Sequence, residues 1–456
     1  MHAKLHLHMQ ASTKHSAWLL SAAKCVRENS LVRGSKVNLF VAMTAITAIA
    51  SLNVLKHIQT IAIPNTLYKS QFRNTTEGPW SRDDNTHQQE SLGGWRRALA
   101  SSNQRVANAV IIGDSIACCI GPQDYGNVWT NSLRTYINLH YMQHGSGVIP
   151  VGSNDKLALN PLSPEWSIHN NTGQTSVVNF GPYQTGVGAF GGVFKLTGDA
   201  DLTLLLPEKR PDNLVLYYAS STDSGAGILV SAERKALGIF GKESSPRFLA
   251  HTAVIPLKQI SSKISFSPAL ASGSVYIYGA EFIYHDEGVS IHNLAHGYAR
   301  SEAFGSDTAA QLAFLDKIPG GIQLAVISLG VNDSINGTGT TASEYRSNMQ
   351  QIISYLRQLN PDVSIFIYDQ ISTRPGEAAT LLPQSLIREQ EKQLAQTNHG
   401  AYLSPLSRWG TFSVASARGY FSPDGIHPTD LGDRELASLL ETMLLEEDDS
   451  ALAMSR

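Results

Sequence analysis

The chain has 456 residues, of which 42% are hydrophobic and 16% charged, and its formal net charge is -3 at pH 7. This composition is that of ordinary globular proteins and excludes a disordered or fibrous chain. It also excludes a dedicated nucleic-acid binder, because no cluster of basic residues lies beyond residue 36. The length exceeds what one hydrophobic core organises and predicts two or three folded units.

The N-terminal segment has the layout of an export signal. Residues 1–36 are basic, and residues 37–55 are uncharged. Ala48-Ile49-Ala50 has the small-x-small pattern of a cleavage site, although residues 37–55 could instead remain as a membrane anchor. Either outcome predicts a bacterial protein that works outside the cytoplasm, in the periplasm or anchored and facing outward. The alternative is a buried core helix.

The sequence pattern changes along the residues that follow the leader. Residues 57–104 are polar and turn-rich, with a short helix expected at 95–102. An apolar strand is expected at 105–112, and it stops at Gly113 before a turn into a helix. Short β-branched and aromatic runs separated by Gly, Ser and Pro then predict an all-β unit over residues 161–285.

After this unit, strands alternate with helices again, which is typical of a parallel sheet covered on both faces. Thr341 and Glu344 have the spacing of a capping box before one of these helices. We therefore predict an α/β domain interrupted by a β-sandwich-like insertion. The expected organisation is a leader (1–56), a linker with a short helix (57–104), the first part of the α/β domain (105–160), the insertion (161–285) and the second part (286–448). The helices and strands expected in the second part lie at 306–318, 324–330, 342–359, 363–370, 383–398 and 429–445.

Cysteines and histidines suggest little chemistry of their own. The chain has three cysteines, and Cys118 and Cys119 are neighbours, so no disulfide framework is implied and both are expected to be small buried residues. His285, His292 and His296 lie in one stretch but lack the Cys or carboxylate partners of a zinc site. We expect no metal site.

Reactive groups of open α/β sheets gather at the carboxyl ends of the strands. Ser115 follows the strand at 105–112, and a serine nucleophile needs a histidine to take its proton and a carboxylate to orient that histidine. Asp424 and His427 are three residues apart before the last expected helix and can supply both groups. The predicted catalytic triad is therefore Ser115, His427 and Asp424.

An oxyanion formed at Ser115 would need hydrogen-bond donors. The amide of Ser115 is one candidate, and the side chain of Asn332, at the end of the strand at 324–330, is another. A glycine lets the backbone approach the substrate closely. Gly297 is the first choice for this position and Gly288 the alternative.

These blocks resemble the SGNH/GDSL hydrolase family, which has Gly-Asp-Ser at the nucleophile, a glycine block, Gly-x-Asn-Asp and Asp-x-x-His near the C-terminus. Here they are Gly113-Asp114-Ser115, the segment with Gly297, Gly330-Val331-Asn332-Asp333 and Asp424 to His427. The layout is most similar to bacterial peptidoglycan O-acetylesterases of this family, which carry a β module between the nucleophile and glycine blocks. The resemblance implies a flavodoxin-like sheet, a Ser-His-Asp esterase mechanism and no cofactor.

The resulting hypothesis is a serine esterase that removes O-acetyl groups from an extracytoplasmic glycan, with peptidoglycan as the first candidate. Its expected partner is the acetylated glycan. Two alternatives remain open, a lipase or short-chain ester hydrolase and a non-catalytic glycan-binding or assembly protein. An apolar acyl pocket would distinguish the former, and loss of a triad member would indicate the latter.

Overall fold

The computed structural model describes most of the chain after residue 89. The predicted leader at residues 1–56, including the apolar stretch 37–55, lies outside the described residues, as do residues 57–89 of the predicted linker. Within the described part, no helix is long and apolar enough to cross a membrane. The described residues are 90–118, 128–151, 166–169, 176–179, 192–198, 200–219, 226–233, 235–241, 250–258, 260, 262–270, 273–305, 308, 312–335, 339–369, 373–374 and 382–445.

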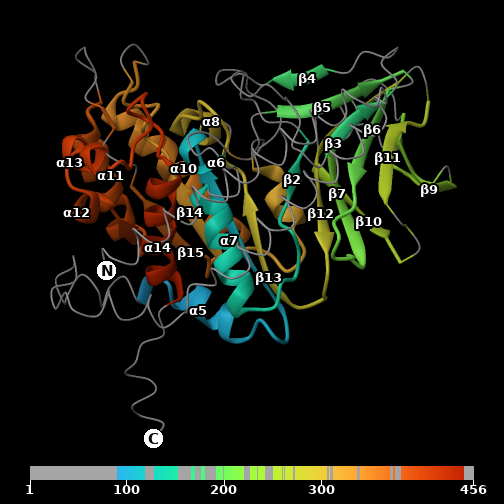
Figure 1. The fold of residues 1–456 in the computed structure, drawn as a ribbon, viewed down its shortest axis with the longest axis horizontal. Coiled ribbons are helices and arrows are strands. Elements are labelled where there is room, and N and C mark those ends of the chain that lie inside the picture. Colours follow the sequence, from blue (N-terminus) through green and yellow to red (C-terminus); the bar gives the residue numbers. More distant parts are fainter. Residues whose placement is uncertain are drawn as a thin grey trace, which may run out of the picture. The chain divides into compact units, whose positions relative to one another are not determined.

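A parallel sheet forms the centre of the α/β domain (Figure 1). All of its pairings are parallel, and counted along the chain its strands have the order 2-1-3-4-5, which is the flavodoxin-like order. The predicted fold class is therefore confirmed. From one edge to the other the strands are β13 (Gly288–Asn293), β1 (Val106–Gly113), β14 (Leu324–Ser328), β15 (Ser364–Tyr368) and β16 (Ala401–Leu403).

Helices cover both faces of this sheet, because alternate residues of each strand point to opposite sides. On β1, Val110 and Ile112 pack in one core with α10 and α11, whereas Ala109 and Ile111 pack in a second core with α5, α7 and α14. The helices in the described part are α5 (Gly93–Ala100), α6 (Ser115–Cys118), α7 (Trp129–His140), α8 (Ser301–Gly305), α10 (Ala342–Leu359), α11 (Gln384–Thr397), α12 (Leu406–Trp409), α13 (Phe412–Ala417) and α14 (Asp430–Leu445).

Most of the expected helices of the α/β domain are present, and one differs. The capping box of α10 is confirmed: the Glu344 amide donates to Thr341 Oγ1, and the Glu344 carboxylate accepts from the Thr341 amide. Of the helix expected at 306–318, Thr308 is α-helical as expected, whereas the described end is a 3₁₀ helix, η2 (Ala313–Lys317). Pro319 disfavours helical geometry at the residue before it, which is extended with ψ 121°.

Two antiparallel sheets interrupt the α/β domain between α7 and β13, as the predicted insertion requires (Figure 1). The first has the order β10-β7-β12-β5-β4, with β2 also paired to β12, and the second has the order β3-β6-β11-β8-β9. The strands of the first are β2 (Ile149–Pro150), β4 (Ser176–Asn179), β5 (Gly192–Thr197), β7 (Asn213–Ala219), β10 (Ala250–Pro256) and β12 (Ser274–Ile283); those of the second are β3 (Trp166–His169), β6 (Asp201–Leu205), β8 (Ile228–Ala232), β9 (Lys235–Phe240) and β11 (Lys263–Pro268).

The two central strands of the first antiparallel sheet, β7 and β12, are buried on both faces. Leu216 and Tyr218 of β7 enter the core between the two antiparallel sheets, which makes the insertion a sandwich. Val215 and Tyr217 of the same strand enter the core of the α/β domain, where the Tyr217 ring meets Phe314 of η2 edge-on at 5.9 Å. The insertion is therefore packed onto the α/β domain and shares a hydrophobic core with it.

A β-bulge in β12 directs a carboxylate into this shared boundary. Tyr276 pairs with Ala219 and Gly279 pairs with Tyr217, so β12 carries an extra residue between these pairs. The alternation of side chains reverses beyond the bulge, and Glu281 consequently faces the α/β domain rather than the sandwich core.

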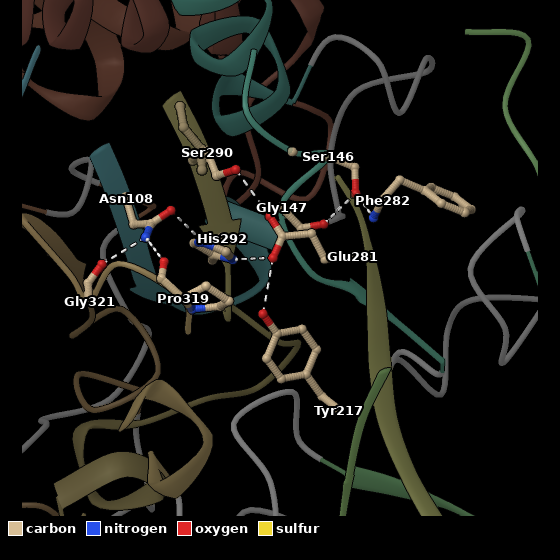
Figure 2. Close-up of polar contacts among 12 residues, drawn as sticks. Asn108, Ser146, Gly147, Tyr217, Glu281, Phe282, Ser290, His292, Pro319 and Gly321 are labelled. Carbon is tan, nitrogen blue, oxygen red and sulfur yellow. Dashed lines mark hydrogen bonds and ion pairs between the residues drawn. The ribbon is translucent and has the colours of Figure 1, made fainter. Parts of the chain in front are cut away.

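Glu281 is the acceptor of a buried polar cluster between the two parts (Figure 2). It accepts hydrogen bonds from the hydroxyls of Tyr217 and Ser290, both at 3.0 Å, and from the Gly147 amide. His292 Nδ1 lies 3.9 Å from its Oε2 atom. Because Ser290 and His292 belong to β13, the cluster ties the edge of the parallel sheet to the insertion.

Of the two neighbouring cysteines, the structure describes Cys118. Cys118 is buried at the end of α6, as expected. It is also disulfide-bonded, a single bond that was not predicted. A count of three cysteines argues against a framework of several bonds but does not exclude a single one.

Candidate active site

Ser115 lies where β1 turns into α6, at the carboxyl edge of the parallel sheet. A Cβ atom at Gly113 would stand 2.7 Å from the Ala117 Cβ and 3.1 Å from the Ser328 carbonyl oxygen, so only glycine fits this tight turn. The buried Asp114 carboxylate accepts a hydrogen bond from the Ile116 amide at 3.0 Å and fixes the turn from inside. The serine that follows is held with its side chain at the sheet edge.

Asp424 and His427 lie in a closed turn before α14. Gly425 has φ +71°, a left-handed conformation that side chains disfavour, and the Ser422 amide donates to the His427 carbonyl at 2.9 Å to close the turn. The Asp424 Oδ1 atom accepts hydrogen bonds from the Ile426 and His427 amides and from the Ser422 hydroxyl. The carboxylate is therefore oriented before it meets the imidazole.

The structure brings the three predicted triad residues together. His427 Nε2 lies 2.9 Å from Ser115 Oγ, and His427 Nδ1 lies 2.7 Å from Asp424 Oδ2. An ionised carboxylate only accepts hydrogen bonds, so Nδ1 carries the proton and the lone pair of Nε2 faces the serine hydroxyl. This is the tautomer that a general base needs.

Solvent access differs along this chain of hydrogen bonds. Ser115 is 7% exposed and the His427 side chain 13%, whereas the Asp424 side chain is 46% exposed. Partial burial alone would raise the pKa of Asp424, but the hydrogen bonds donated by His427 and its neighbours outweigh it and hold the pKa below the usual value. Asp424 is therefore ionised throughout the neutral range.

The three candidate oxyanion donors belong to segments that meet at the end of β1, where the His296 amide bonds the Gly113 carbonyl and the Asn332 side chain reaches Asp114. Within the described residues, neither the Ser115 amide nor the Gly297 amide donates a hydrogen bond. The Asn332 side-chain nitrogen donates to the Ala299 carbonyl at 2.9 Å and reaches Asp114 Oδ2 only at 3.5 Å. The first bond orients the amide, and the second is weak enough to be exchanged for a substrate oxygen.

The alternative glycine, Gly288, is not part of this site. It pairs with Val106 at the start of β1, whereas Ser115 follows the end of β1. Its φ is +115°, and a Cβ atom at this position would collide with the Met142 carbonyl oxygen, which explains why glycine stands there. The structure thus leaves Gly297 as the glycine near the nucleophile.

Two histidines of the stretch between β12 and α8, His292 and His296, are buried. His296 donates from its amide to the Gly113 carbonyl at 3.2 Å and bonds the Gly297 carbonyl through Nδ1. Burial lowers the pKa of His296 to about 4 and that of His292 to about 3, so both rings are neutral near pH 7. In the described part of the chain, no three His, Cys, Asp or Glu side chains are grouped to hold a metal ion.

Residues 278–435 match the model of the GDSL-like lipase/acylhydrolase family. The matched range contains Gly297, Asn332, Asp424 and His427, and the insertion separates it from Ser115. The matched part of the chain is thus that of an SGNH/GDSL hydrolase. The matched family and the geometry of the site together identify a carboxylic ester hydrolase.

A solved structure supports the assignment of the fold. A peptidoglycan O-acetylesterase superimposes with a TM-score of 0.61 at 14% sequence identity, over 81% of this chain and 99% of that chain. A salicylyl-acyltransferase from a tetracycline biosynthetic pathway has 14% identity over 65% of this chain and 97% of its own, but its TM-score is only 0.29. No curated protein sequence matches the chain.

Sequence reasoning missed three supporting groups of the hydrolase site. Asp114 fixes the nucleophile turn, Ser422 donates to Asp424 at 2.7 Å, and the Ala299 carbonyl orients Asn332. Asp114 and Ser422 stand within or beside the recognised blocks and could have been proposed as turn residues. Nothing in the sequence distinguishes Ala299, because its contribution is a backbone carbonyl.

Proposed function

We propose that this hydrolase removes O-acetyl groups from an extracytoplasmic glycan, with peptidoglycan as the first candidate substrate, through an acetyl-enzyme. The observation that carries the proposal is the hydrogen-bonded series Ser115–His427–Asp424 beside two amides that have no acceptor in the described part of the chain. A nucleophile, its base, the group that orients the base and donors for an oxyanion are the parts that acyl transfer requires.

In the proposed first half-reaction, Ser115 Oγ attacks the acetyl carbonyl carbon while His427 Nε2 takes the hydroxyl proton. The negative charge passes to the carbonyl oxygen, which accepts hydrogen bonds from the Ser115 and Gly297 amides and the Asn332 side chain. The bond to the sugar oxygen then breaks, and His427 returns the proton to that oxygen. In the second half-reaction, water attacks the acetyl carbonyl carbon while His427 Nε2 takes a proton from the water. The bond between this carbon and Ser115 Oγ then breaks, and His427 returns the proton to Oγ. The product leaves as acetic acid, which ionises to acetate.

The glycan part of the proposal is supported by similarity of fold. The chain covers nearly all of the peptidoglycan O-acetylesterase structure, including strands of the insertion. An insertion that shares a core with the hydrolytic domain can hold one orientation relative to the catalytic edge. We propose that it holds the sugar chain or shapes the cleft, a role that rests on analogy.

The decisive experiment measures acetate release from O-acetylated peptidoglycan, acetylated xylan and aryl acetate by the wild type and by Ser115→Ala. We expect Ser115→Ala to lower the rate at least about 1,000-fold without lowering the melting temperature. Ser413→Ala, an exposed serine on α13, is the matched control and should retain the wild-type rate. Equal rates for the wild type and Ser115→Ala would contradict the mechanism, and a preference for long-chain acyl esters would favour a lipase.

We also propose that the leader directs the protein out of the cytoplasm, with residues 37–55 as a cleaved signal or as an anchor. The support is the order of the basic and uncharged segments. Cell fractionation of the full chain and of a chain lacking residues 1–56 tests this. Export that survives the deletion would contradict the proposal.

A further inference from the structure

Tyr298 has an unusual backbone conformation for an aromatic residue. Its φ is +62°, in the left-handed region that disfavours side chains other than those of Gly, Asn and Asp. Within the described residues, Glu233 and His399 are the other non-glycine residues with positive φ. Glu233 lies in the hairpin between β8 and β9, and His399 follows the end of α11, where such conformations are routine.

The position of Tyr298 in its turn makes this conformation informative. The Ala299 amide donates to the His296 carbonyl at 3.3 Å, which closes a four-residue turn with Gly297 and Tyr298 at its centre. The second central position of such a turn favours glycine when its φ is positive. The chain instead has glycine one position earlier, so the left-handed position carries an aromatic side chain that local geometry disfavours.

Burial does not compensate for the conformation, because Tyr298 is 45% exposed. The residues on both sides are buried and bonded: His296 donates to the Gly113 carbonyl, and the Ala299 carbonyl accepts from Asn332. Backbone strain that the surroundings impose on a residue concentrates at functional sites. The surroundings here hold a tyrosine ring at the surface without burying it in a core.

These contacts place the tyrosine backbone beside the nucleophile. The Asn332 side-chain nitrogen reaches both the Ala299 carbonyl and Asp114 Oδ2, so one amide group spans the residue after Tyr298 and the residue before Ser115. The amide of Gly297, directly before Tyr298, is one of the proposed oxyanion donors. A substrate whose carbonyl lies at these donors would have its remaining atoms close to the tyrosine.

We propose that Tyr298 contacts the substrate and sets the preference for sugar esters, by packing its ring against the pyranose that carries the acetyl group. This inference rests on the proposed function. A tyrosine suits the task because its ring offers a flat apolar face to the C–H groups of a sugar while its hydroxyl stays in water. A small aryl acetate would react at the same donors without needing that contact.

The test compares Tyr298→Gly and Tyr298→Phe with the wild type on O-acetylated peptidoglycan and on aryl acetate. We expect Tyr298→Gly to lower kcat/KM for the glycan about 10-fold, mainly through KM, and to leave kcat/KM for aryl acetate within about twofold. Tyr298→Phe retains the ring and should stay within about threefold of the wild type on both substrates.

A melting experiment separates the contact from a structural role. Tyr298→Gly should raise the melting temperature by about 2 °C, because glycine adopts the positive φ without strain. His399→Gly is the matched control: it relieves the same kind of conformation at the end of α11 and should leave both activities unchanged.

The outcomes are distinguishable. Glycan activity that survives Tyr298→Gly overturns the assignment of Tyr298, and an equal loss on both substrates does so as well, since it would indicate a damaged oxyanion turn. If the wild type hydrolyses aryl acetate but no acetylated glycan, the proposed function fails, and this inference fails with it.

Discussion

Two histidine–carboxylate pairs in this hydrolase differ in the direction in which the pKa of the carboxyl group is shifted. In the catalytic pair, Asp424 and His427 are 2.7 Å apart, and the carboxylate side chain is 46% exposed. In the boundary pair, Glu281 and His292 are 3.9 Å apart and almost completely buried (Figure 2). Hydrogen bonds lower the pKa of Asp424, whereas burial raises that of Glu281.

In the buried pair, the histidine is neutral. Asn108 donates both amide hydrogens to backbone carbonyls, so its Oδ1 atom faces His292 and must accept from Nε2. His292 Nδ1 then has only a lone pair to turn toward Glu281, and it has no hydrogen-bond partner among the described residues. The comparison teaches that burial and hydrogen-bond donors, rather than the residue types, decide in which direction the pKa of the carboxyl group is shifted.

The largest expected effect is on kcat and comes from a substitution that disrupts the catalytic pair. Asp424→Asn should lower kcat about 10,000-fold, because an asparagine amide favours the wrong tautomer of His427. The melting temperature should change little, since the side chain is half exposed. Steady-state kinetics and thermal melts check this, with Asp430→Asn on α14 as the control that retains activity. A kcat within tenfold of the wild type would mean that Asp424 does not orient the histidine.

The next largest effect is on the free energy of unfolding and comes from a substitution in the buried pair. Glu281→Ala should lower the free energy of unfolding by about 3 kcal/mol, because Tyr217, Ser290 and the Gly147 amide lose their acceptor in a buried site. The activity of the folded fraction should persist. Glu281→Gln keeps an acceptor oxygen and should cost much less. Urea denaturation distinguishes the two variants, and similar losses for both would indicate that Glu281 is needed as a charge.

The smallest expected effect is on the pH dependence of stability, and it tests whether His292 of the buried pair is neutral. Because burial depresses the pKa of His292 to about 3, the unfolded chain takes up a proton below the usual pKa of 6.5 while the folded chain does not. This contribution to stability is present above pH 6.5 and is lost toward pH 3, by at most about 1.4 kcal/mol per pH unit. His292→Gln should therefore lose less stability than the wild type between pH 6.5 and pH 4 in urea denaturation. Parallel losses would contradict a neutral His292.

The catalytic edge of the fold could be predicted from sequence because its signals are local. Gly113-Asp114-Ser115 and Asp424 to His427 are short blocks whose geometry depends on a few neighbouring residues. Apolar strands such as β1 and β14 were predicted for the same reason, since both are buried runs of aliphatic residues. Periodicity and capping were enough to predict the long helices α10 and α14.

Strand β13 was missed because its pattern does not resemble a buried parallel strand. Ser290 and His292 alternate with apolar residues along it, which is typical of a strand with one solvent-exposed face. Both polar residues are nevertheless buried, because Glu281 and Asn108 satisfy them from other segments. Such long-range compensation, which depends on the bulge in β12, is not visible in any local pattern. Strand β16 was missed because it has only three residues.

The pairing of β1 has a consequence for how the protein is made. Both neighbours of this strand, β13 and β14, follow the insertion in the chain. On a chain that emerges from its N-terminus, the strand that precedes Ser115 therefore has neither partner until the whole sandwich has been synthesised. Its aliphatic residues remain available for wrong contacts during that interval, so early folding of the insertion and protection of β1 by chaperones should matter for the yield of active enzyme.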